Sequence, residues 1–209
     1  MGPLERSPSA RRSGEAGTRT VRHGGGARLS GRVVNAGAPV PGAQVRLLRR
    51  IDRRGSREAV VGRPLVTGSD GRFSYRVAPG PSRELRFGVR ADPTLPTFAC
   101  SARLRLRVRA SSSLHASRTR LVGAGRVRFS GRLRDGWVPR RGTIVVLQAF
   151  TRGRWQPFAS PRTSARGGWR ASYPFNGRPG TYRIRVRIPG DAAYPFAPGV
   201  TRTIRVRVF

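Results

Sequence analysis

The stretch Arg103-Leu104-Arg105-Leu106-Arg107-Val108-Arg109 decides the fold class of this 209-residue chain. Aliphatic and basic side chains alternate along it, so an extended backbone places the aliphatic ones on one face of a sheet and the arginines on the other. A helix would instead spread the arginines around its whole circumference. The same alternation recurs at 183–188 and 204–208. The pattern predicts β-strands that each have one buried and one solvated face.

An internal repeat predicts two similar domains. The segment 29–33 (LSGRV) recurs as 129–133 (FSGRL), and 67–73 (TGSDGRF) aligns without a gap on 163–169 (TSARGGW). Residues typical of turns separate short alternating runs, so each half offers six or seven strands, as expected of a β-sandwich. The side chains expected to point inward are Phe73, Tyr75 and Val77 in the first half, and Trp169, Ala171 and Tyr173 in the second, with Val145 and Leu147 opposite.

The predicted boundaries follow from the repeat. Residues 1–26 are rich in Arg, Gly, Ser and Pro and lack the apolar core of a secretory signal, so they predict a disordered arm. We expect the first sandwich at 27–109, a linker at 110–113 (ASSS) and the second sandwich at 114–209.

The motifs resemble those of bacterial immunoglobulin-like and prealbumin-like modules called carboxypeptidase regulatory-like domains. The resemblance rests on the opening strand 29–33, the small-residue strand start at 38–45 and the T-x-x-D-G-R-F element at 67–73. The second half matches more loosely, through Gly180-Thr181-Tyr182, and has Arg166 where that element has its acid. The resemblance implies an all-β fold of two tandem immunoglobulin-like β-sandwich domains after the arm.

The same resemblance implies a function and a location. It suggests a non-catalytic structural, spacer or adhesive module of a bacterial surface or exported protein, located outside the cytoplasm. No secretory signal is visible, so we expect either a fragment of a larger protein or another export route.

The formal net charge of +34 comes from 43 basic residues, all of them arginine. A GC-rich coding sequence would favour arginine without any function, and outward arginines would also guard sheet edges. Alternatively, guanidinium groups bind phosphate and carboxylate well, which favours an anionic partner. That partner is expected to be an anionic cell-wall polymer, lipid headgroups or neighbouring domains. The candidate anion-binding face comprises Arg183, Arg185, Arg187, Arg205 and Arg207, on strands expected to be neighbours, and Arg103, Arg105 and Arg107 in the first half.

No residue pattern indicates catalysis, a cofactor or a metal. His23 and His115 have no Cys or carboxylate partner nearby in sequence, and the nine acidic residues are scattered. Cys100 is the single cysteine and is expected to be a small buried side chain. We therefore predict a protein that is not an enzyme, without cofactors. No apolar run approaches the roughly 20 residues of a membrane span.

Two alternative functions stay open. The basic charge is also compatible with a cytoplasmic nucleic-acid-binding protein, but the arginines follow strand periodicity, and no recognised motif interleaves aromatic residues with them. Trp137 and Trp155 lie near predicted turns, where we expect edge packing. The second alternative is a regulatory or appended domain of an enzyme.

Overall fold

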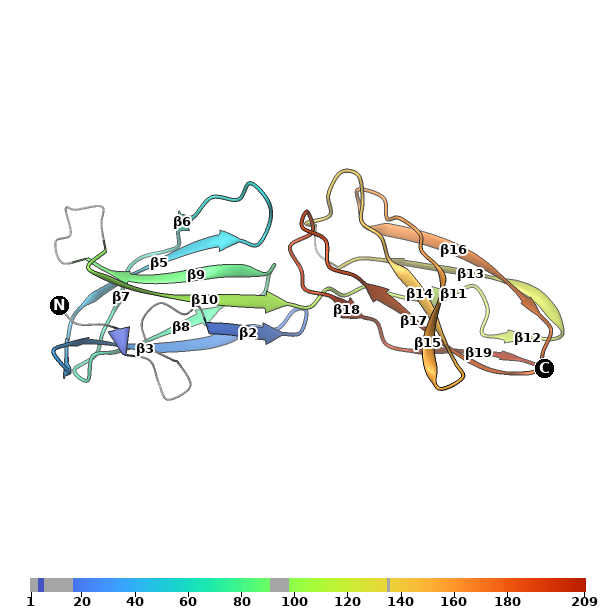
Figure 1. The fold of residues 1–209 in the computed structure, drawn as a ribbon, viewed down its shortest axis with the longest axis horizontal. Coiled ribbons are helices and arrows are strands. Elements are labelled where there is room, and N and C mark those ends of the chain that lie inside the picture. The colour runs from blue at the N-terminus through green and yellow to red at the C-terminus, as the bar shows by residue number, and fades with distance from the viewer. Residues whose placement is uncertain (1–3, 6–16, 91–97, 135) are drawn as a thin grey trace. The chain divides into compact units, whose positions relative to one another are not determined.

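The structure is a computed structural model that describes residues 4–5, 17–90, 98–134 and 136–209. It divides into two compact units, Met1–Val108 and Arg109–Phe209, called domain 1 and domain 2 below. All regular elements of the described residues are β-strands, which confirms the predicted all-β class (Figure 1). The described residues contain no helix long and apolar enough to cross a membrane.

Domain 1 consists of two sheets. In the first, β3 pairs with β1, β4 and β8. The second has the order β2-β10-β9-β5-β6, with β7 also paired to β5. The strand bounds are β1 Leu4–Glu5, β2 Gly17–Val21, β3 Ala27–Asn35, β4 Ala38–Pro39, β5 Gln44–Ile51, β6 Ala59–Val60, β7 Leu65–Val66, β8 Arg72–Val77, β9 Arg83–Val89 and β10 Cys100–Val108.

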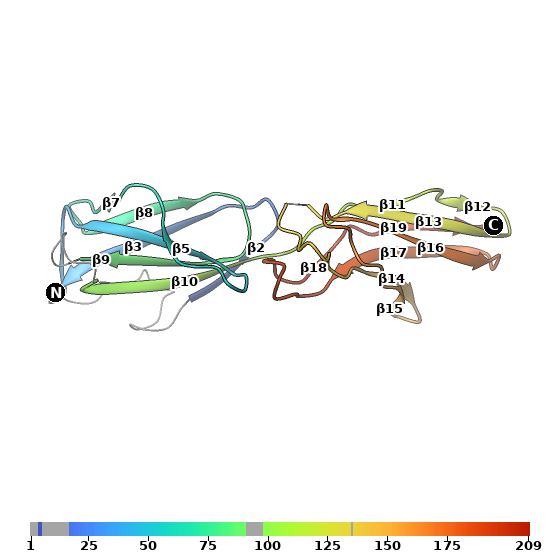
Figure 2. The same ribbon diagram turned by 90° about the horizontal axis from the view of Figure 1, so that it is seen from above.

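Domain 2 repeats this arrangement. Its first sheet has the order β11-β13-β16 and its second β12-β19-β17-β14-β15, with β18 paired to β17. The edge strand β15 forms a hairpin with β14, and this hairpin is seen at the rim of its sheet in Figure 2. The strand bounds are β11 His115–Ala116, β12 Arg120–Leu121, β13 Ala124–Arg132, β14 Val146–Thr151, β15 Arg154–Ala159, β16 Gly168–Asn176, β17 Gly180–Ile188, β18 Gly199–Val200 and β19 Ile204–Val208.

The alternation of aliphatic and basic residues in the sequence gives each sheet one buried and one solvent-exposed face. On β10, Leu106 and Val108 are buried, whereas Arg103, Arg105 and Arg107 are exposed. Most side chains expected in the cores are buried there: Phe73, Val77, Val145, Leu147 and Trp169 are buried, and Tyr75 and Ala171 are half-buried.

The prediction for Tyr173 is wrong, because its side chain is 38% exposed. Its ring contacts Phe158 and Phe175, with ring centroids 4.9 and 5.2 Å away. Tyr173 belongs to β16, which lies at the edge of a three-stranded sheet and therefore has a neighbouring strand on one side only.

The repeat also organises the backbone in the same way in both domains. Thr67 and Thr163 are buried, and each hydroxyl accepts a hydrogen bond from a strand-entry amide, of Ala43 at 2.8 Å and Thr143 at 3.0 Å. The element 67–73 needs Asp70, whose carboxylate accepts the Arg72 amide at 2.9 Å. Domain 2 has no acid there, and the Ser164 hydroxyl accepts the Gly168 amide at 3.2 Å instead.

A second shared device pairs a glycine with an aromatic residue on the neighbouring strand. Gly31 of β3 lies opposite Phe73 of β8, and Gly131 of β13 lies opposite Trp169 of β16. In both domains the aromatic ring occupies the space where a side chain at the glycine would stand. The segments LSGRV and FSGRL thus repeat because their glycines accommodate these rings.

The prediction of a disordered arm over 1–26 is wrong for its described parts. Leu4–Glu5 pairs with β3, and Gly17–Val21 forms β2, which runs parallel to β10. β2 satisfies hydrogen-bonding groups along the edge of β10 that would otherwise have no strand partner. The remaining arm residues, 1–3 and 6–16, lie outside the described residues, as does Asp135.

The residues predicted as a linker, 110–113, lie in domain 2 instead. The Ala110 amide donates to the Ala197 carbonyl at 2.8 Å, and the Ser113 amide donates to the Arg132 carbonyl at 3.0 Å. The Ser112 hydroxyl accepts the buried indole N–H of Trp169 at 2.9 Å. Small polar residues look like a linker in the sequence, yet here they close the domain 2 core.

Candidate anion-binding face

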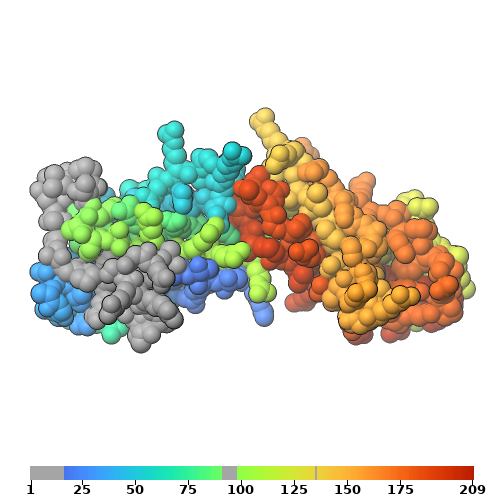
Figure 3. Space-filling view, viewed as in Figure 1, coloured from blue at the N-terminus to red at the C-terminus, as the bar shows by residue number. Residues whose placement is uncertain are grey.

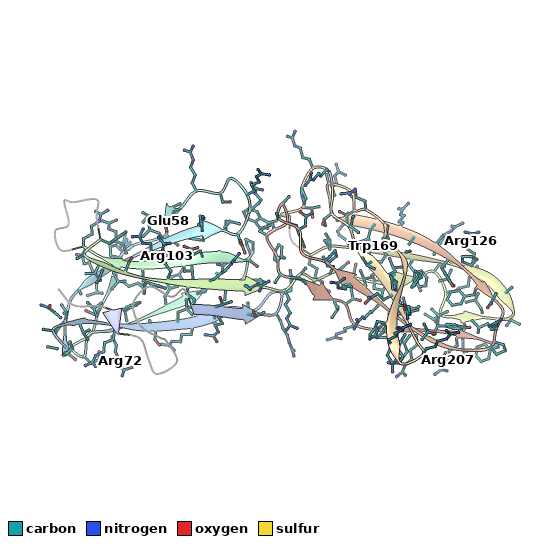
Figure 4. The ribbon with its side chains drawn as sticks, in the orientation of Figure 1. Glu58, Arg72, Arg103, Arg126, Trp169 and Arg207 are labelled. Atoms are coloured by element: carbon teal, nitrogen blue, oxygen red, sulfur yellow. The ribbon has the colours of Figure 1, made fainter. Side chains whose placement is uncertain are left out.

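The strand order brings five predicted arginines of domain 2 onto one sheet. β17 and β19 are antiparallel neighbours, and Arg183 stands directly opposite Arg205. Arg183, Arg187, Arg205 and Arg207 are exposed, and Arg185 is half-buried. Arg120 of β12 lies opposite Arg207 and extends the row. We call Arg183, Arg185, Arg187, Arg205 and Arg207 the domain 2 arginine face; Figure 4 labels Arg207.

Two aromatic residues support this face from the β14–β15 hairpin. The guanidinium of Arg183 lies 4.0 Å from the ring centroid of Phe150, and that of Arg185 lies 4.0 Å from the ring centroid of Trp155. The two rings also contact each other edge to face, with centroids 5.3 Å apart. Cation–π contacts of this kind hold an arginine in place and contribute about 0.5–1 kcal/mol at exposed sites. Figure 3 shows the hairpin, in orange, open at the surface of the molecule.

The turn of this hairpin explains why the two rings meet. Arg152 and Gly153 both have positive φ, at 48° and 77°. Two such residues in succession form the tight turn that joins antiparallel strands in register. Phe150 is therefore directly opposite Trp155. The sequence signal was the spacing F-T-R-G-R-W, and the expectation of simple edge packing for Trp155 overlooked its contact with Arg185.

Arg185 is the most constrained arginine of the face. Its Nε donates to the Gln148 side-chain carbonyl at 2.9 Å, next to the Trp155 contact. Burial lowers the pKa of its guanidinium, and the neighbouring charge of Arg187 lowers the pKa further. An arginine stays protonated in proteins despite such shifts. The lowered pKa therefore marks a cation that an added anion would stabilise.

Two of the three corresponding arginines of domain 1, Arg103 and Arg105, have acidic partners. An Arg105 nitrogen lies 2.9 Å from Asp52, while Glu84 lies 2.9 Å from Arg50 and 3.7 Å from Arg103. Glu58 and Arg103, both labelled in Figure 4, also come from this domain, and Glu58 lies 3.6 Å from Arg86. Arg107 is exposed, opposite Thr20 of β2. We call Arg103, Arg105 and Arg107 the domain 1 arginine face.

Domain 2 has no equivalent of this network among the residues that the structure describes. Every ion pair between described residues lies in domain 1. The sequence explains the difference, since Asp135 and Asp191 are the only acids among residues 109–209, against 21 arginines. Asp191 is occupied in a loop, where it accepts hydrogen bonds from the Thr143 hydroxyl at 3.0 Å and the Ala193 amide at 2.8 Å.

The residues considered for catalysis lie on different elements of the chain. His23 is half-buried in the turn after β2, His115 is exposed on β11, and Cys100 begins β10. No group of three or more His, Cys, Asp or Glu side chains that could hold a metal occurs within the described ranges. Burial raises the pKa of the Cys100 thiol, which disfavours its nucleophilic thiolate form.

Strand order defines the class of protein. In each domain, one sheet formed around the third strand (β3 or β13) faces a larger sheet in which a short strand runs parallel to the last strand. This two-sheet division of about 100 residues is that of immunoglobulin-like β-sandwiches. The chain thus consists of two tandem immunoglobulin-like domains.

Comparisons with known proteins add neighbours but no family. No protein-family model matches the chain, and no curated protein matches it. The finer resemblance to carboxypeptidase regulatory-like domains therefore stays a prediction.

Two solved structures are similar over most of the chain. One is of fibronectin(III)-like modules of Clostridium thermocellum CbhA, with 11% identity, a TM-score of 0.28, and coverage of 92% of this chain and 90% of that one. The other is a tetra-tandem repeat from the extending region of a large adhesion protein, with 16% identity and a TM-score of 0.38. That match covers 93% of this chain and half of the other.

Proposed function

We propose that this chain is a non-catalytic adhesive module of a bacterial surface or exported protein. In this proposal the domain 2 arginine face contacts an anionic cell-wall polymer, and domain 1 acts as a structural spacer. The observation that carries the proposal is the unequal pairing of the two arginine faces. Carboxylates already engage the domain 1 face, whereas the domain 2 face has no ion pair within the described part of the chain.

Electrostatics gives the physical reason. Arg183 and Arg205 are directly opposite each other, and like charges in that position destabilise a sheet by a few tenths of a kcal/mol to about 1 kcal/mol. A bound anion would relieve this repulsion and so gain affinity from it. The row of arginines along β17 and β19 presents repeated cations, which suits a polymer with repeated anionic groups better than a single small ion.

The aromatic supports strengthen the argument. Phe150 and Trp155 hold the guanidinium groups of Arg183 and Arg185 at fixed positions on the sheet. Cations that are already ordered lose less conformational entropy when an anion binds. The face is therefore better prepared for binding than a set of solvated arginine side chains.

Nucleic acid is the second candidate partner, and one observation favours it. Phe150 and Trp155 do interleave with arginines on a sheet face, which is a feature of surfaces that bind single strands. However, a guanidinium already covers a face of each ring, and this reduces the aromatic surface on which a base could stack. We therefore favour the cell-wall polymer.

Binding to three probes across a salt series tests the proposal. The probes are a purified anionic wall polymer, DNA, and vesicles containing anionic lipid. We expect binding to the wall polymer to persist at about 0.15 M salt, where long-range attraction is largely screened. Release from all three probes at one salt concentration would reject a dedicated partner, and a preference for DNA would support the second candidate instead.

A further inference from the structure

A second basic feature of domain 2 lies on its other sheet. A hollow of about 770 Å³ opens beside β11, β13 and β16. Its lining includes four arginines that belong to neither arginine face: Arg132, Arg162, Arg166 and Arg170. Small-molecule sites in proteins have volumes of about 300–1,000 Å³, so the hollow can hold a ligand the size of one or two sugar units.

Strand register builds this hollow. His115, Ser130 and Arg170 lie in a row across β11, β13 and β16, and Arg132 lies opposite Gly168 in the next row. These residues alternate with the buried side chains of Phe129 and Trp169, so they stand on the outer side of the sheet. Trp169, labelled in Figure 4, contributes to the lining from the start of β16.

Short side chains leave the space open between the long ones. Gly168 has no side chain, and a Cβ added there would meet only the Ser164 hydroxyl, at 3.6 Å. Ser130 is the small residue of the adjoining row, between His115 and Arg170. Arg132 and Arg170 are exposed on either side of these positions. The hollow thus forms because Gly168 and Ser130, which have little or no side chain, lie next to Arg132 and Arg170 in adjoining rows of the sheet.

Hydrogen bonds orient two serines of the lining. The Ser113 hydroxyl oxygen accepts the Arg132 amide at 3.0 Å, and the Ser164 hydroxyl oxygen accepts the Gly168 amide at 3.2 Å. Each oxygen is therefore held by a backbone donor, which leaves its O–H to donate to a ligand. Among the residues that the structure describes, no carboxylate lines the hollow. Its donors are thus guanidinium and hydroxyl groups together with the imidazole of His115.

We infer that this hollow binds a tetrahedral oxyanion, the phosphate or sulfate monoester group of a sugar unit. Several forked guanidinium groups around one space can share the three terminal oxygens of such a group, and the serine hydroxyls add short donors. A planar carboxylate has two oxygens and would satisfy one fork only. The site lies on a different sheet from the domain 2 arginine face. This inference can therefore be tested independently of the proposed function.

The three tryptophans provide a direct measurement, since all of them lie in domain 2, at positions 137, 155 and 169. Trp169 itself belongs to the lining, and its indole N–H donates to Ser112, the residue before Ser113 of the lining, whereas Trp155 lies on the arginine face. The full chain with ¹⁵N-labelled tryptophan gives one indole NMR signal for each residue, and the variants Trp137→Phe and Trp155→Phe assign them. The chain is titrated with glucose 6-phosphate, glucose 6-sulfate, glucuronate and glucose.

We expect a saturable shift of the Trp169 signal with the phosphate or the sulfate, and none with glucose. The double variant R132Q/R170Q should weaken this binding about tenfold, because it removes charged hydrogen bonds to the ligand. R126Q/R128Q is the matched control, since both arginines are exposed on β13 outside the lining and the charge loss is the same. This control should bind like the unmodified chain.

Four results would overturn the inference. They are the absence of a saturable Trp169 shift, an equal response to glucuronate, unchanged affinity in R132Q/R170Q, and equal weakening in the control. A stronger response to phosphate than to sulfate, or the reverse, supports the site and identifies which ester it prefers. The variant R183Q/R205Q/R207Q separates this inference from the proposed function, because it should weaken polymer binding and keep the Trp169 shift.

Discussion

The two domains share a backbone plan but treat their surface arginines differently. In domain 1, Asp52 and Glu84 neutralise part of the arginine face, at distances of 2.9 Å from Arg105 and 3.7 Å from Arg103. In domain 2, Phe150 and Trp155 hold Arg183 and Arg185 without neutralising them. The strand order and the buried threonine of the repeat are nevertheless the same. The repeat therefore preserves the strand order and the buried residues on which the fold depends. The outward side chains, which differ between the domains, determine how much positive charge a partner can contact.

The largest expected effect concerns the paired glycines. A Cβ at Gly131 would stand 2.1 Å from the Ser113 carbonyl oxygen, whereas at Gly31 the nearest atom, at 2.5 Å, belongs to the Phe73 ring. A backbone atom moves less readily than a ring. We therefore expect Gly131→Ala to lower the free energy of unfolding of domain 2 by about 3 kcal/mol, and Gly31→Ala to lower that of domain 1 by about 1 kcal/mol.

Natural probes allow each domain to be followed separately in denaturant. All three tryptophans lie in domain 2, so tryptophan fluorescence reports its unfolding. Cys100 lies in domain 1, and its labelling by a thiol reagent reports that domain. Equal losses in the two domains would show that the close Ser113 carbonyl does not distinguish them.

The next effect compares the two arginine faces directly. R183Q/R205Q/R207Q should weaken binding to the anionic wall polymer about tenfold, since each exposed charge contact contributes roughly 0.2–1 kcal/mol. R103Q/R105Q/R107Q removes the same charge but should weaken binding only about twofold, because carboxylates already engage Arg103 and Arg105. Titration calorimetry at constant salt measures both. Similar losses would mean that net charge alone determines affinity.

A smaller effect follows from exchanging the acids between the domains. Asp52→Asn with Glu84→Gln releases arginines of domain 1 and should raise polymer affinity about threefold. Gln148→Glu places a carboxylate beside Arg185 in domain 2 and should lower affinity by about the same factor. The same calorimetric titration serves for both variants. Changes in the same direction would contradict the role assigned to the carboxylates.

The smallest expected effect concerns the reactivity of Cys100, the thiol whose labelling reports the unfolding of domain 1. Burial raises the pKa of its thiol, so the folded domain holds the proton more tightly than the unfolded chain. This contribution to stability is present below the unfolded pKa and is lost as pH rises through the folded pKa. Alkylation at pH 8 should be slower in the folded chain than in denaturant, because the thiolate is the reactive form. The two rates should converge at higher pH, and equal rates at pH 8 would contradict the assigned burial.

Much of the fold could be predicted because its signals are local. Alternation in the stretch 103–109 and turns with glycine depend on residues close in sequence, and so does the repeated TGSDGRF element. The arm and linker predictions failed for one common reason. Gly17–Val21 and 110–113 are polar and rich in small residues, yet partners far along the chain, β10 and Ala197, give them hydrogen bonds. Composition describes a segment alone and says nothing of such partners.

The candidate sites divide in the same way. That the arginines of 183–187 and 205–207 point outward was determined by the sequence, because alternation fixes the face of every residue on a strand. Only the tertiary structure decided which of them meet an acid, which lie over Phe150 or Trp155, and which surround the hollow at Gly168. Pairing depends on strand order and register between segments up to tens of residues apart, such as Arg105 and Asp52. The periodicity of one strand does not reveal which strands lie beside it. The outward arginine charge could therefore be predicted from the sequence, whereas its neutralisation by acidic side chains could not.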